Sequence, residues 1–331
     1  TSFTVQTTVT DLIARHMSDI PNSVHFSTTS SLFDIAKIKM TDIVTLTEHF
    51  RCIEELIGFS NNLSYNGRLK VLRDQLPKDK LDPVLEAVFV DCGFEETNGQ
   101  VNKAEAEKLV EKLQEMLADE RYKETTEGGI TRPTTFGVIS LLGKEQSKHI
   151  TKLISEKVSS KEIEERQIIC GDPYTFQGDE RDIILLSMVK GCDQDNPNAN
   201  IMPYTVNKKE NKQRVNVAMS RARNKMVLFH SIPKDKLQNP DDLRKMIMDW
   251  FYNHKTEERK AGLQRIREEV ERGRASEFEY EVAEILINKG YKVIPQWEVA
   301  GYRIDLVVQG ENSKLAIECD GDKYHNAIEK W

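Results

Sequence analysis

The chain has 331 residues, of which 38% are hydrophobic and 31% charged, and its formal net charge is −7. This length predicts two domains, and no apolar run approaches the roughly 20 residues that a membrane span requires. The acidic balance argues against nucleic-acid binding over the whole surface, although an acidic protein can still carry a local basic groove that contacts phosphates. The five cysteines form no Cys-x-x-Cys pair, which argues against structural zinc and favours free thiols in a reducing cytoplasm. We therefore expect a cytoplasmic protein without a membrane partner.

The first half of the chain predicts one helix and the start of a sheet. Residues 1–31 carry few landmarks, and the chain opens on Thr1 without a signal sequence, so we expect it to be cut from a longer protein. From Asn102 to Leu117, apolar residues recur at helical spacing, which predicts an amphipathic helix that covers a sheet. Apolar strands are expected at Phe136 to Leu142, Ile183 to Val189 and Lys225 to His230. Strands that alternate with helices predict a parallel α/β sheet.

The last third of the chain predicts a linker and a smaller α+β domain. The segment from His254 to Ser276 is almost wholly charged and helix-prone, which predicts an exposed linking helix. An amphipathic helix is expected from Phe278 to Lys289. Short strands follow at Lys292 to Gln296, Tyr302 to Val308 and Lys314 to Asp320. We expect this domain to be cut off at Trp331.

A polar turn with one glycine, Thr175 to Asp182, leads directly into the apolar strand IILLSMV. In α/β sheets, ligands bind at loops at the ends of strands and at neighbouring helix N-termini. A solvated connection is the alternative, and this segment alone does not decide between the two.

An arginine-rich segment, Arg214 to Arg223, precedes the strand KMVLFH. On a helix with 100° per residue, Arg214 and Arg221 share one face and Arg223 points almost the opposite way. Two arginines on one face can clamp phosphate oxygens with paired hydrogen bonds. Surface arginines on a solvated helix are the alternative, but the small residues between them favour close packing.

Together these two segments resemble motifs V and VI of superfamily 1 helicases, especially the branch that includes the nonsense-mediated decay helicase. Upstream segments continue the family pattern in the same order: Glu48 to Arg51, Leu56 to Asn61, Tyr65 to Gly67, Asn102 to Ala106, Phe136 to Ser140, and Gln146. The resemblance spans Leu32 to about Ser231. It implies a RecA-like parallel sheet with helices on both faces.

The resemblance also implies roles for particular residues. Arg221 matches the arginine finger that reaches the ATP γ-phosphate, and Arg51 matches its companion. Such fingers contribute roughly 10³ to 10⁵ in rate. Gln177 and Glu180 would couple the nucleotide state to the face that binds the nucleic-acid strand. The expected nucleotide-binding set is Gln177, Gly178, Glu180 and Arg214.

The nucleotide-cradling half of such a motor is not recognisable in the sequence. The string nearest to a phosphate loop, Gly137 to Lys144, has one residue too many between its glycines and Glu145 in the hydroxyl position. No Asp-Glu pair at the end of an apolar strand precedes Arg51. We therefore expect the first motor domain of the same parent protein to be the partner, and we expect no ATPase activity from this chain alone.

The last two predicted strands flank a polar turn, which is a hairpin signal. A turn centred near Glu311 places Asp305 opposite residue 317 or 318. Alternation along the second strand places Glu318 and Asp320 on one face and apolar residues on the other. The sequence therefore predicts a cluster of carboxylates on one face of the hairpin.

Such a cluster repels itself unless a divalent cation is bound, and carboxylate oxygens are the ligands that Mg²⁺ prefers. Glu279 on the preceding helix and Gln296 one strand earlier are placed to join it. Solvated acids on the outer face of a hairpin are the weaker alternative. The expected metal ligands are Asp305, Glu318 and Glu279.

The tail resembles the restriction-endonuclease-like superfamily, and more closely its branch around the very-short-patch-repair endonuclease. In that superfamily an Asp and a Glu-x-Lys carry the chemistry. Asp305 and Glu318 match this pattern, but Asp320 stands where the lysine is usual, which leaves the general base open. His325 is a candidate for proton transfer or for stabilising the leaving group.

These observations give one division of the chain and one main hypothesis. The expected parts are an unplaced segment at 1–31, the second RecA-like motor domain at 32–250, a charged linking helix at 251–275, and the beginning of a truncated nuclease-like domain at 276–331. In the full-length protein, ATP-driven translocation would deliver single- or double-stranded DNA to a Mg²⁺-dependent endonuclease, in defence against foreign DNA or in repair. An inactive nuclease-like clamp and a motor that acts on RNA are the alternatives.

Overall fold

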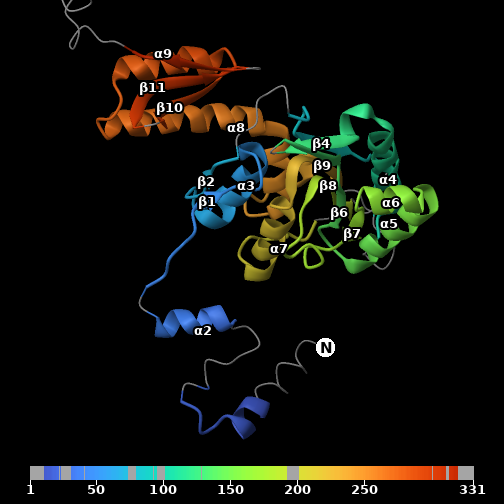
Figure 1. Cartoon of the computed structure of the whole chain (residues 1–331). Helices are drawn as coiled ribbons and strands as arrows, with labels where there is room; N and C mark the ends of the chain where they lie inside the picture. The colour runs from blue at the N-terminus through green and yellow to red at the C-terminus, as the bar shows by residue number, and fades with distance from the viewer. Residues whose placement is uncertain are drawn as a thin grey trace, which may run out of the picture. The chain divides into compact units, whose positions relative to one another are not determined.

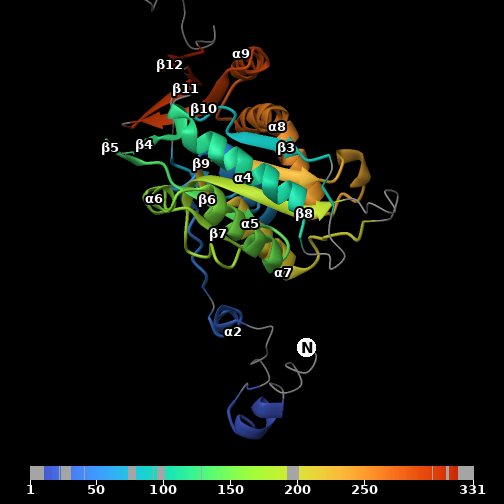
Figure 2. The ribbon, with the colours of Figure 1, turned by 90° about the vertical axis from the view of Figure 1, so that its right-hand side faces the viewer.

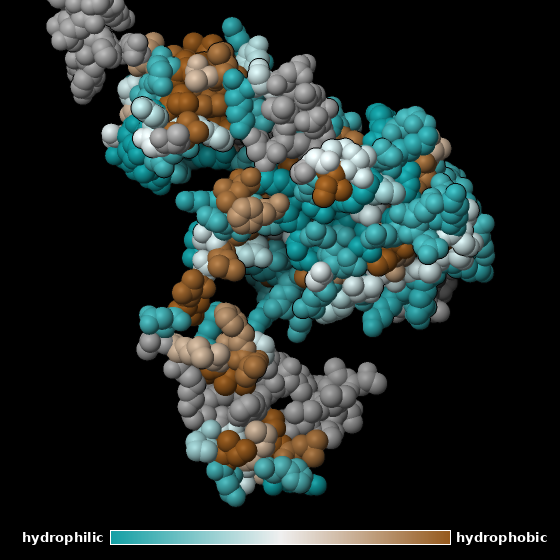
Figure 3. Space-filling view, viewed as in Figure 1, coloured by the Kyte–Doolittle hydropathy of each residue, from teal (hydrophilic) through white to brown (hydrophobic). Residues whose placement is uncertain are grey.

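The computed structural model describes residues 11–21, 23, 31–40, 42–73, 80–91, 93–94, 101–127, 129–191, 201–299, 301–310 and 313–319, apart from a few side chains within these ranges. The chain divides into two compact units, residues 1–47 and residues 48–331. The first unit contains helix α2 (Leu32–Lys39), which begins with a capping box between Ser31 and Asp34. Apolar atoms lie on the viewed face of α2 (Figure 3), where Leu32 and Phe33 are 81% and 60% exposed.

The centre of the second unit is a five-stranded sheet in the order β3-β9-β8-β6-β7, with every neighbouring pair parallel (Figure 1). Its strands are β3 (Leu85–Phe89), β6 (Phe136–Ser140), β7 (Ile169–Gly171), β8 (Arg181–Gly191) and β9 (Ala222–Ser231). The three predicted strands are confirmed as β6, β8 and β9. Their side chains are almost all buried, because helices cover both faces of the sheet.

Two hydrophobic clusters lie on opposite faces of this sheet. One is formed with α4 (Lys103–Ala118), α5 (Lys144–Lys157) and α6 (Ser160–Glu165), and Figure 2 shows α4 lying across the strands. The other is formed with α3 (Glu54–Tyr65), α7 (Lys209–Met219) and the start of α8 (Leu243–Glu271). The predicted helix from Asn102 is confirmed as α4, whose N-cap Asn102 accepts a hydrogen bond from the backbone of Glu105. The α/β architecture with helices on both faces is therefore confirmed.

Two small pairs of strands flank the sheet, and neither was predicted. The parallel pair is β1 (Glu48–His49) with β2 (Lys70–Val71). The antiparallel pair is β4 (Glu124–Glu127) with β5 (Ile130–Pro133). Paired threonine hydroxyls brace this second hairpin: Thr125 with Thr134 at 2.9 Å and Thr126 with Thr131 at 2.8 Å.

The helix α8 leads from the motor sheet to a smaller α+β domain. It begins at Leu243, earlier than the predicted linking helix, and its Ile266 is buried in the small domain's core. This domain consists of α9 (Glu277–Asn288) and an antiparallel sheet of β10 (Lys292–Val299), β11 (Tyr302–Gln309) and β12 (Lys314–Ile317). The predicted small α+β domain is confirmed, although β12 ends before Asp320. Among the described residues, no helix combines the length and apolar character of a membrane span.

Candidate functional site

The two helicase-like segments meet at the amino ends of β8 and β9. The polar turn Thr175 to Asp182 runs into β8, and Arg221 directly precedes β9. Because Arg181 pairs with Ala222 in these parallel strands, the residues before each strand lie side by side, and Arg181 N donates to Arg221 O at 3.1 Å. The site is therefore at the amino edge of the sheet, whereas ligands of doubly wound sheets usually bind at the carboxyl edge.

The expectation that Arg214 to Arg223 form one helix is wrong. Helix α7 ends at Met219, and Arg223 lies within β9. Pairing with β8 converts the chain from helix to strand at Ala222, so helical angles do not describe the directions of these arginines. Arg223 does not point away from the site, because its Nη1 lies 3.5 Å from Glu180 Oε1.

Within the part of the chain that the structure describes, Arg221 donates its hydrogen bonds to neutral oxygens. Its Nε donates to Val217 O at 3.0 Å, its Nη1 to Asp179 O at 3.3 Å and its Nη2 to Ser220 Oγ at 3.0 Å. Burial, followed by the charge of Arg51, lowers the pKa of Arg221. Two neighbouring guanidinium groups, one of them bonded to neutral acceptors, favour the binding of an anion at this edge.

Arg51 lies in the short loop between β1 and α3 and faces Glu180. Its Nε donates to Glu180 Oε2. His49 Nε2 accepts a hydrogen bond from Cys52 N at 3.0 Å and so braces the loop. Burial, followed by the charge of Arg51, lowers the pKa of His49, which favours the neutral ring that this acceptor role requires.

Three arginines and two glutamates close into a ring around this loop. Glu180 contacts Arg51 and Arg223, and Arg223 Nη2 also donates to Glu127 Oε2. Glu127 Oε1 lies 3.6 Å from Arg73 Nε, and Arg73 Nη1 donates to the carbonyls of Arg51 at 2.8 Å and Arg223 at 2.6 Å. We call Arg51, Glu180, Arg223, Glu127 and Arg73 the charge ring.

The sequence interpretation missed two members of the charge ring. Arg73 follows β2 in a stretch without a motif. Glu127 ends β4, and the threonines on either side of Gly128 and Gly129 were the available hairpin signal.

The other predicted nucleotide-binding residues lie on or beside the turn before β8. Gln177 and Gly178 are exposed, and Gly178 has a φ of 87°, a conformation that suits glycine. Arg214 on α7 places its guanidinium 5.4 Å from the centre of the Tyr174 ring. The structure thus brings Arg214 to the turn, and its proposed contact with nucleotide stays a prediction.

The residues Asn102, Glu105 and Gln146, which continue the family pattern, form a buried network at the opposite, carboxyl edge of the sheet. Glu105 Oε1 accepts from Ser187 Oγ at 2.6 Å and from Val189 N at 2.8 Å. Gln146 bonds both the N and the O of Asn102, at 2.9 and 3.1 Å. These contacts fasten α4 and α5 to β8, so they position the fold and do not line the arginine site.

The tail hairpin has the register that the sequence allowed. Leu306 pairs with Ile317, which places Asp305 opposite Glu318, and Asp305 Oδ2 accepts from Cys319 N at 2.8 Å. Glu279 Oε2 accepts from Gln296 Nε2 at 2.8 Å, so helix α9 and strand β10 are joined as expected.

The carboxylates of the tail suit a hard cation in their chemistry. Mg²⁺ is commonly held by one or two carboxylates together with waters and substrate phosphates, which fits the pair Asp305 and Glu318. Glu279 Oε1 is engaged by the N and Oγ of Ser276 in a capping box. Among the described residues, no three His, Cys, Asp or Glu side chains gather as a metal-binding group. Asp320 and His325 lie outside the described residues.

Comparison with known proteins follows the same division of the chain. The profile of the AAA_12 family, described as an AAA domain, matches residues 28–232, which is more than half of the chain. The chain belongs to the AAA_12 family. A second profile, REase_MTES_1575, matches residues 278–331 of this AAA_12 chain. The predicted combination of a helicase-like motor domain and a restriction-endonuclease-like domain is thereby confirmed, while the finer branches stay predictions.

Individual proteins also resemble the AAA_12 chain. The DNA replication ATP-dependent helicase/nuclease DNA2 of Gallus gallus is 24% identical over 207 residues, which are 61% of this chain and 18% of that relative. The chain therefore spans less than a fifth of that relative's length. The crystal structure of the C-terminal domain of a possible DNA helicase from Lactobacillus plantarum is 15% identical, with a TM-score of 0.30, over 55% of this chain and 87% of that one.

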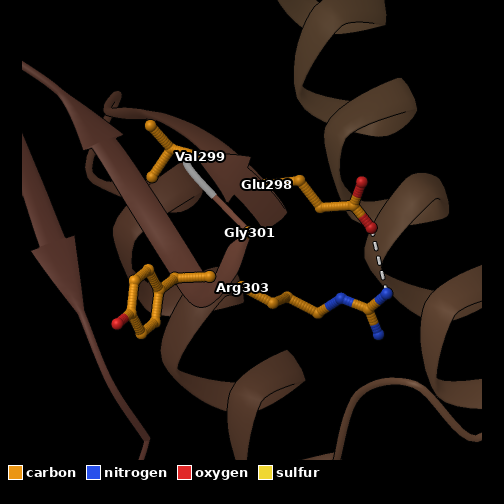
Figure 4. Close-up of a pocket in the computed structure, with 5 residues that line it drawn as sticks. Glu298, Val299, Gly301 and Arg303 are labelled. Atoms are coloured by element: carbon orange, nitrogen blue, oxygen red, sulfur yellow. Dashed lines mark hydrogen bonds and ion pairs between the residues drawn. The ribbon is translucent and has the colours of Figure 1, made fainter.

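A shallow pocket of the AAA_12 chain lies at the turn between β10 and β11. Glu298, Val299, Gly301, Tyr302 and Arg303 line it. Figure 4 shows Glu298 and Arg303 directed toward one another, and their ion pair measures 3.0 Å. The pocket contains none of the predicted site residues, so it does not enter the functional assignment.

Proposed function

We propose that this chain supplies the second motor domain of an ATP-driven nucleic-acid helicase, with Arg221 as the arginine finger and Arg51 as its companion. The observation that carries the proposal is the pair of neighbouring guanidinium groups at the amino edge of β8 and β9, with Arg221 bonded, among the described residues, to neutral oxygens. The family match over this region and the helicase named among the relatives support it.

Hydrolysis of ATP builds negative charge on the oxygens of the transferred phosphoryl group, and guanidinium groups stabilise that charge. The bonds to Val217 O and Asp179 O fix the orientation of Arg221 before nucleotide arrives. Arg51 faces Glu180 in this structure, so it must exchange that carboxylate for phosphate oxygens. The phosphate loop and the catalytic Mg²⁺ of ATP hydrolysis would come from the first motor domain.

Steady-state ATP hydrolysis by the full-length protein tests this assignment. We expect Arg221→Ala to lower the turnover number by roughly 10³-fold or more, with a smaller change in nucleotide affinity, because a finger acts mainly on the transition state. Arg121→Ala is the matched control, since Arg121 is 67% exposed and its contacts are with the nearby Asp119 and Tyr122, away from the charge ring. Equal turnover in Arg221→Ala and Arg121→Ala would contradict the assignment.

We also infer that the tail domain is a Mg²⁺-dependent DNA phosphodiesterase, fed by the motor in defence or repair in the cytoplasm. Asp305 and Glu318 would hold the cation, which supplies Lewis-acid stabilisation of the phosphate when bound. Glu279 holds Gln296, on the strand β10 that pairs with β11, through the 2.8 Å hydrogen bond. The match to a restriction-endonuclease-like family and the helicase/nuclease named among the relatives support a DNA substrate.

Cleavage of DNA by the full-length protein, with and without Mg²⁺, tests the nuclease proposal. Asp305→Ala should abolish cleavage while leaving ATP turnover in place, and the control Glu281→Ala, an exposed acid on α9, should leave both unchanged. Duplex binding without Mg²⁺-dependent cleavage by the wild type would instead support the inactive clamp. That result would leave the motor proposal standing.

A further inference from the structure

The charge ring gives Glu180 two partners that belong to different parts of the motor domain. Its Oε2 accepts from Arg51, which precedes α3, and its Oε1 lies 3.5 Å from Nη1 of Arg223, which is on β9. Glu180 is 33% exposed and Arg223 is 22% exposed, so water screens the pair only in part. The strength of the ion pair between Glu180 and Arg51 therefore depends on Arg223.

We infer that Arg223 is a positioning residue for ATP turnover, which sets how firmly Glu180 holds Arg51, and that hairpin β4–β5 fixes Arg223 through Glu127. This inference rests on the proposed function. Arg51 is the residue that contacts phosphate, and Arg223 acts only through Glu180.

Competition between like charges for one carboxylate supplies the mechanism. With Arg223 in place, the charge of Glu180 is shared between two guanidinium groups, which weakens the ion pair between Glu180 and Arg51. Arg51 therefore leaves Glu180 more easily when phosphate binds. Without Arg223, the whole carboxylate charge acts on Arg51 and retains it. The ring contains three guanidinium groups and two carboxylates, so one positive charge stays available to an anion.

The role of Arg223 requires the shape of a guanidinium. Its Nη1 faces Glu180 and its Nη2 faces Glu127, so one side chain spans two carboxylates. An ammonium group is a compact point charge and does not present two donors in this fork. Arg73 Nη1 adds rigidity, because it bonds the backbone carbonyls of both Arg51 and Arg223.

Hairpin β4–β5 is fastened to the same region at both of its strands. Glu127 ends β4 and pairs with Arg223. On β5, Arg132 Nη2 donates to Asp182 Oδ1 at 2.8 Å, and Asp182 is wholly buried at the start of β8. The hairpin therefore ties the start of β8 to β9, and its position fixes the second carboxylate of Arg223.

Kinetics of the full-length protein in two backgrounds test this inference. In the wild-type background, Arg223→Ala and Arg223→Lys should lower the ATP turnover number by about 10- to 100-fold. Arg51 would then stay with Glu180, away from the phosphate, and a misplacement of about 1 Å can lower a rate by as much as about 10²-fold. Glu127→Gln should act in the same direction by a smaller factor. In an Arg51→Ala background, Arg223→Ala should add less than about a 2-fold change, since residues that act in series are not additive.

A direct readout on this 331-residue chain covers the case in which Arg51→Ala turns over too slowly to measure. The NMR signal of the Arg51 Nε–H, assigned by its disappearance in Arg51→Lys, should move downfield in Arg223→Ala as its bond to Glu180 strengthens. Arg121→Ala should leave the signal in place.

Two results would overturn the inference. An unmoved Arg51 signal in Arg223→Ala would show that the charge ring does not reach Arg51. If the turnover of the double variant Arg51→Ala/Arg223→Ala falls by the product of the losses of the two single variants, Arg223 acts independently of Arg51, either on the nucleotide or on stability. The motor proposal is tested separately by Arg221→Ala. Its outcome does not decide whether Arg223 acts through Glu180 and Arg51.

Discussion

Glu105 is a carboxyl group held within the packed interface of α4 and the sheet. Burial raises its pKa to about 7, and this effect outweighs the opposing donors Ser187, Val189 and Ser231. The folded state therefore keeps the proton of Glu105 in a pH range where the unfolded chain has lost it. A raised pKa contributes stability that is complete below the unfolded value and is lost as the pH rises toward the folded value.

We predict that the free energy of unfolding falls between about pH 4.5 and pH 7 relative to that of Glu105→Gln. The difference should approach ~3 kcal/mol, since each pKa unit corresponds to about 1.4 kcal/mol. Urea unfolding of both proteins at a series of pH values, followed by circular dichroism, measures it. Parallel pH profiles for the two proteins would show that the Glu105 carboxyl is already ionised in the folded state.

Which residues form the arginine site was predictable from the sequence, but the directions in which their side chains point were not. Arg51, Arg221 and Glu180 follow from their place in helicase-like segments. The opposite placement of Arg223 was wrong because strand pairing, not helical periodicity, decides the backbone after Ala222. Contacts such as Arg73 with Glu127 join segments far apart in the sequence, and no local pattern encodes them.

At the scale of elements, α3 and α8 approach closely because Gly58 has no side chain. A Cβ on Gly58 would lie 2.8 Å from Trp250 Cζ2, and Trp250 Nε1 donates to Glu55 O at 3.2 Å. The indole is therefore fixed against α3 and cannot move aside without losing that bond. Gly262 offers a contrast on α8, because a Cβ there would meet only the flexible end of Ile287 at 3.3 Å.

We predict opposite signs for the same substitution at these two helical glycines. Gly58→Ala should destabilise the chain by about 1–3 kcal/mol through overpacking. Gly262→Ala should be neutral or stabilise it by up to about 1 kcal/mol, since alanine is the better helix former. Thermal unfolding of the two variants beside the wild type gives the comparison. A stabilised Gly58→Ala would mean that Trp250 does not pack against α3.

The central strands were predictable because they are apolar along their whole length, as buried parallel strands require. The strands β3 and β7 are short and only partly buried, so they left no such run. The tail hairpin was placed correctly because its register follows from turn position and alternation, which are local properties.

At the scale of the molecule, Glu54 connects the motor domain to the tail. It opens α3, close behind Arg51, and pairs with Arg265 on α8 and with Lys292 on β10 at 3.0 Å. Burial acts to raise the pKa of Glu54, but the charges of Lys292 and Arg265 outweigh it and its pKa is lowered. The loop that carries Arg51 is thus linked by charge to the nuclease-like domain.

We predict that this link is weak and sensitive to salt. Partly exposed ion pairs contribute about 0.2–1 kcal/mol, so Glu54→Ala should speed trypsin cleavage within α8 by only a few-fold. Raising the NaCl concentration from about 0.05 M to about 0.5 M should speed cleavage of the wild type and leave Glu54→Ala nearly unchanged, because salt screens such pairs. Glu281→Ala serves as the control. If NaCl speeds cleavage of the wild type and of Glu54→Ala by the same factor, Glu54 does not hold the two domains together.

The most direct test of the motor assignment compares how the full-length protein binds ADP and ADP with aluminium fluoride, which mimics the transferring phosphoryl group. We predict that Arg221→Ala weakens binding of the mimic by roughly 10³-fold, because an arginine finger stabilises the transition state. Binding of ADP alone should change by less than about 3-fold, and Arg121→Ala should match the wild type for both ligands. Equal losses for ADP and for the mimic, or no loss for either, would contradict the assignment of Arg221.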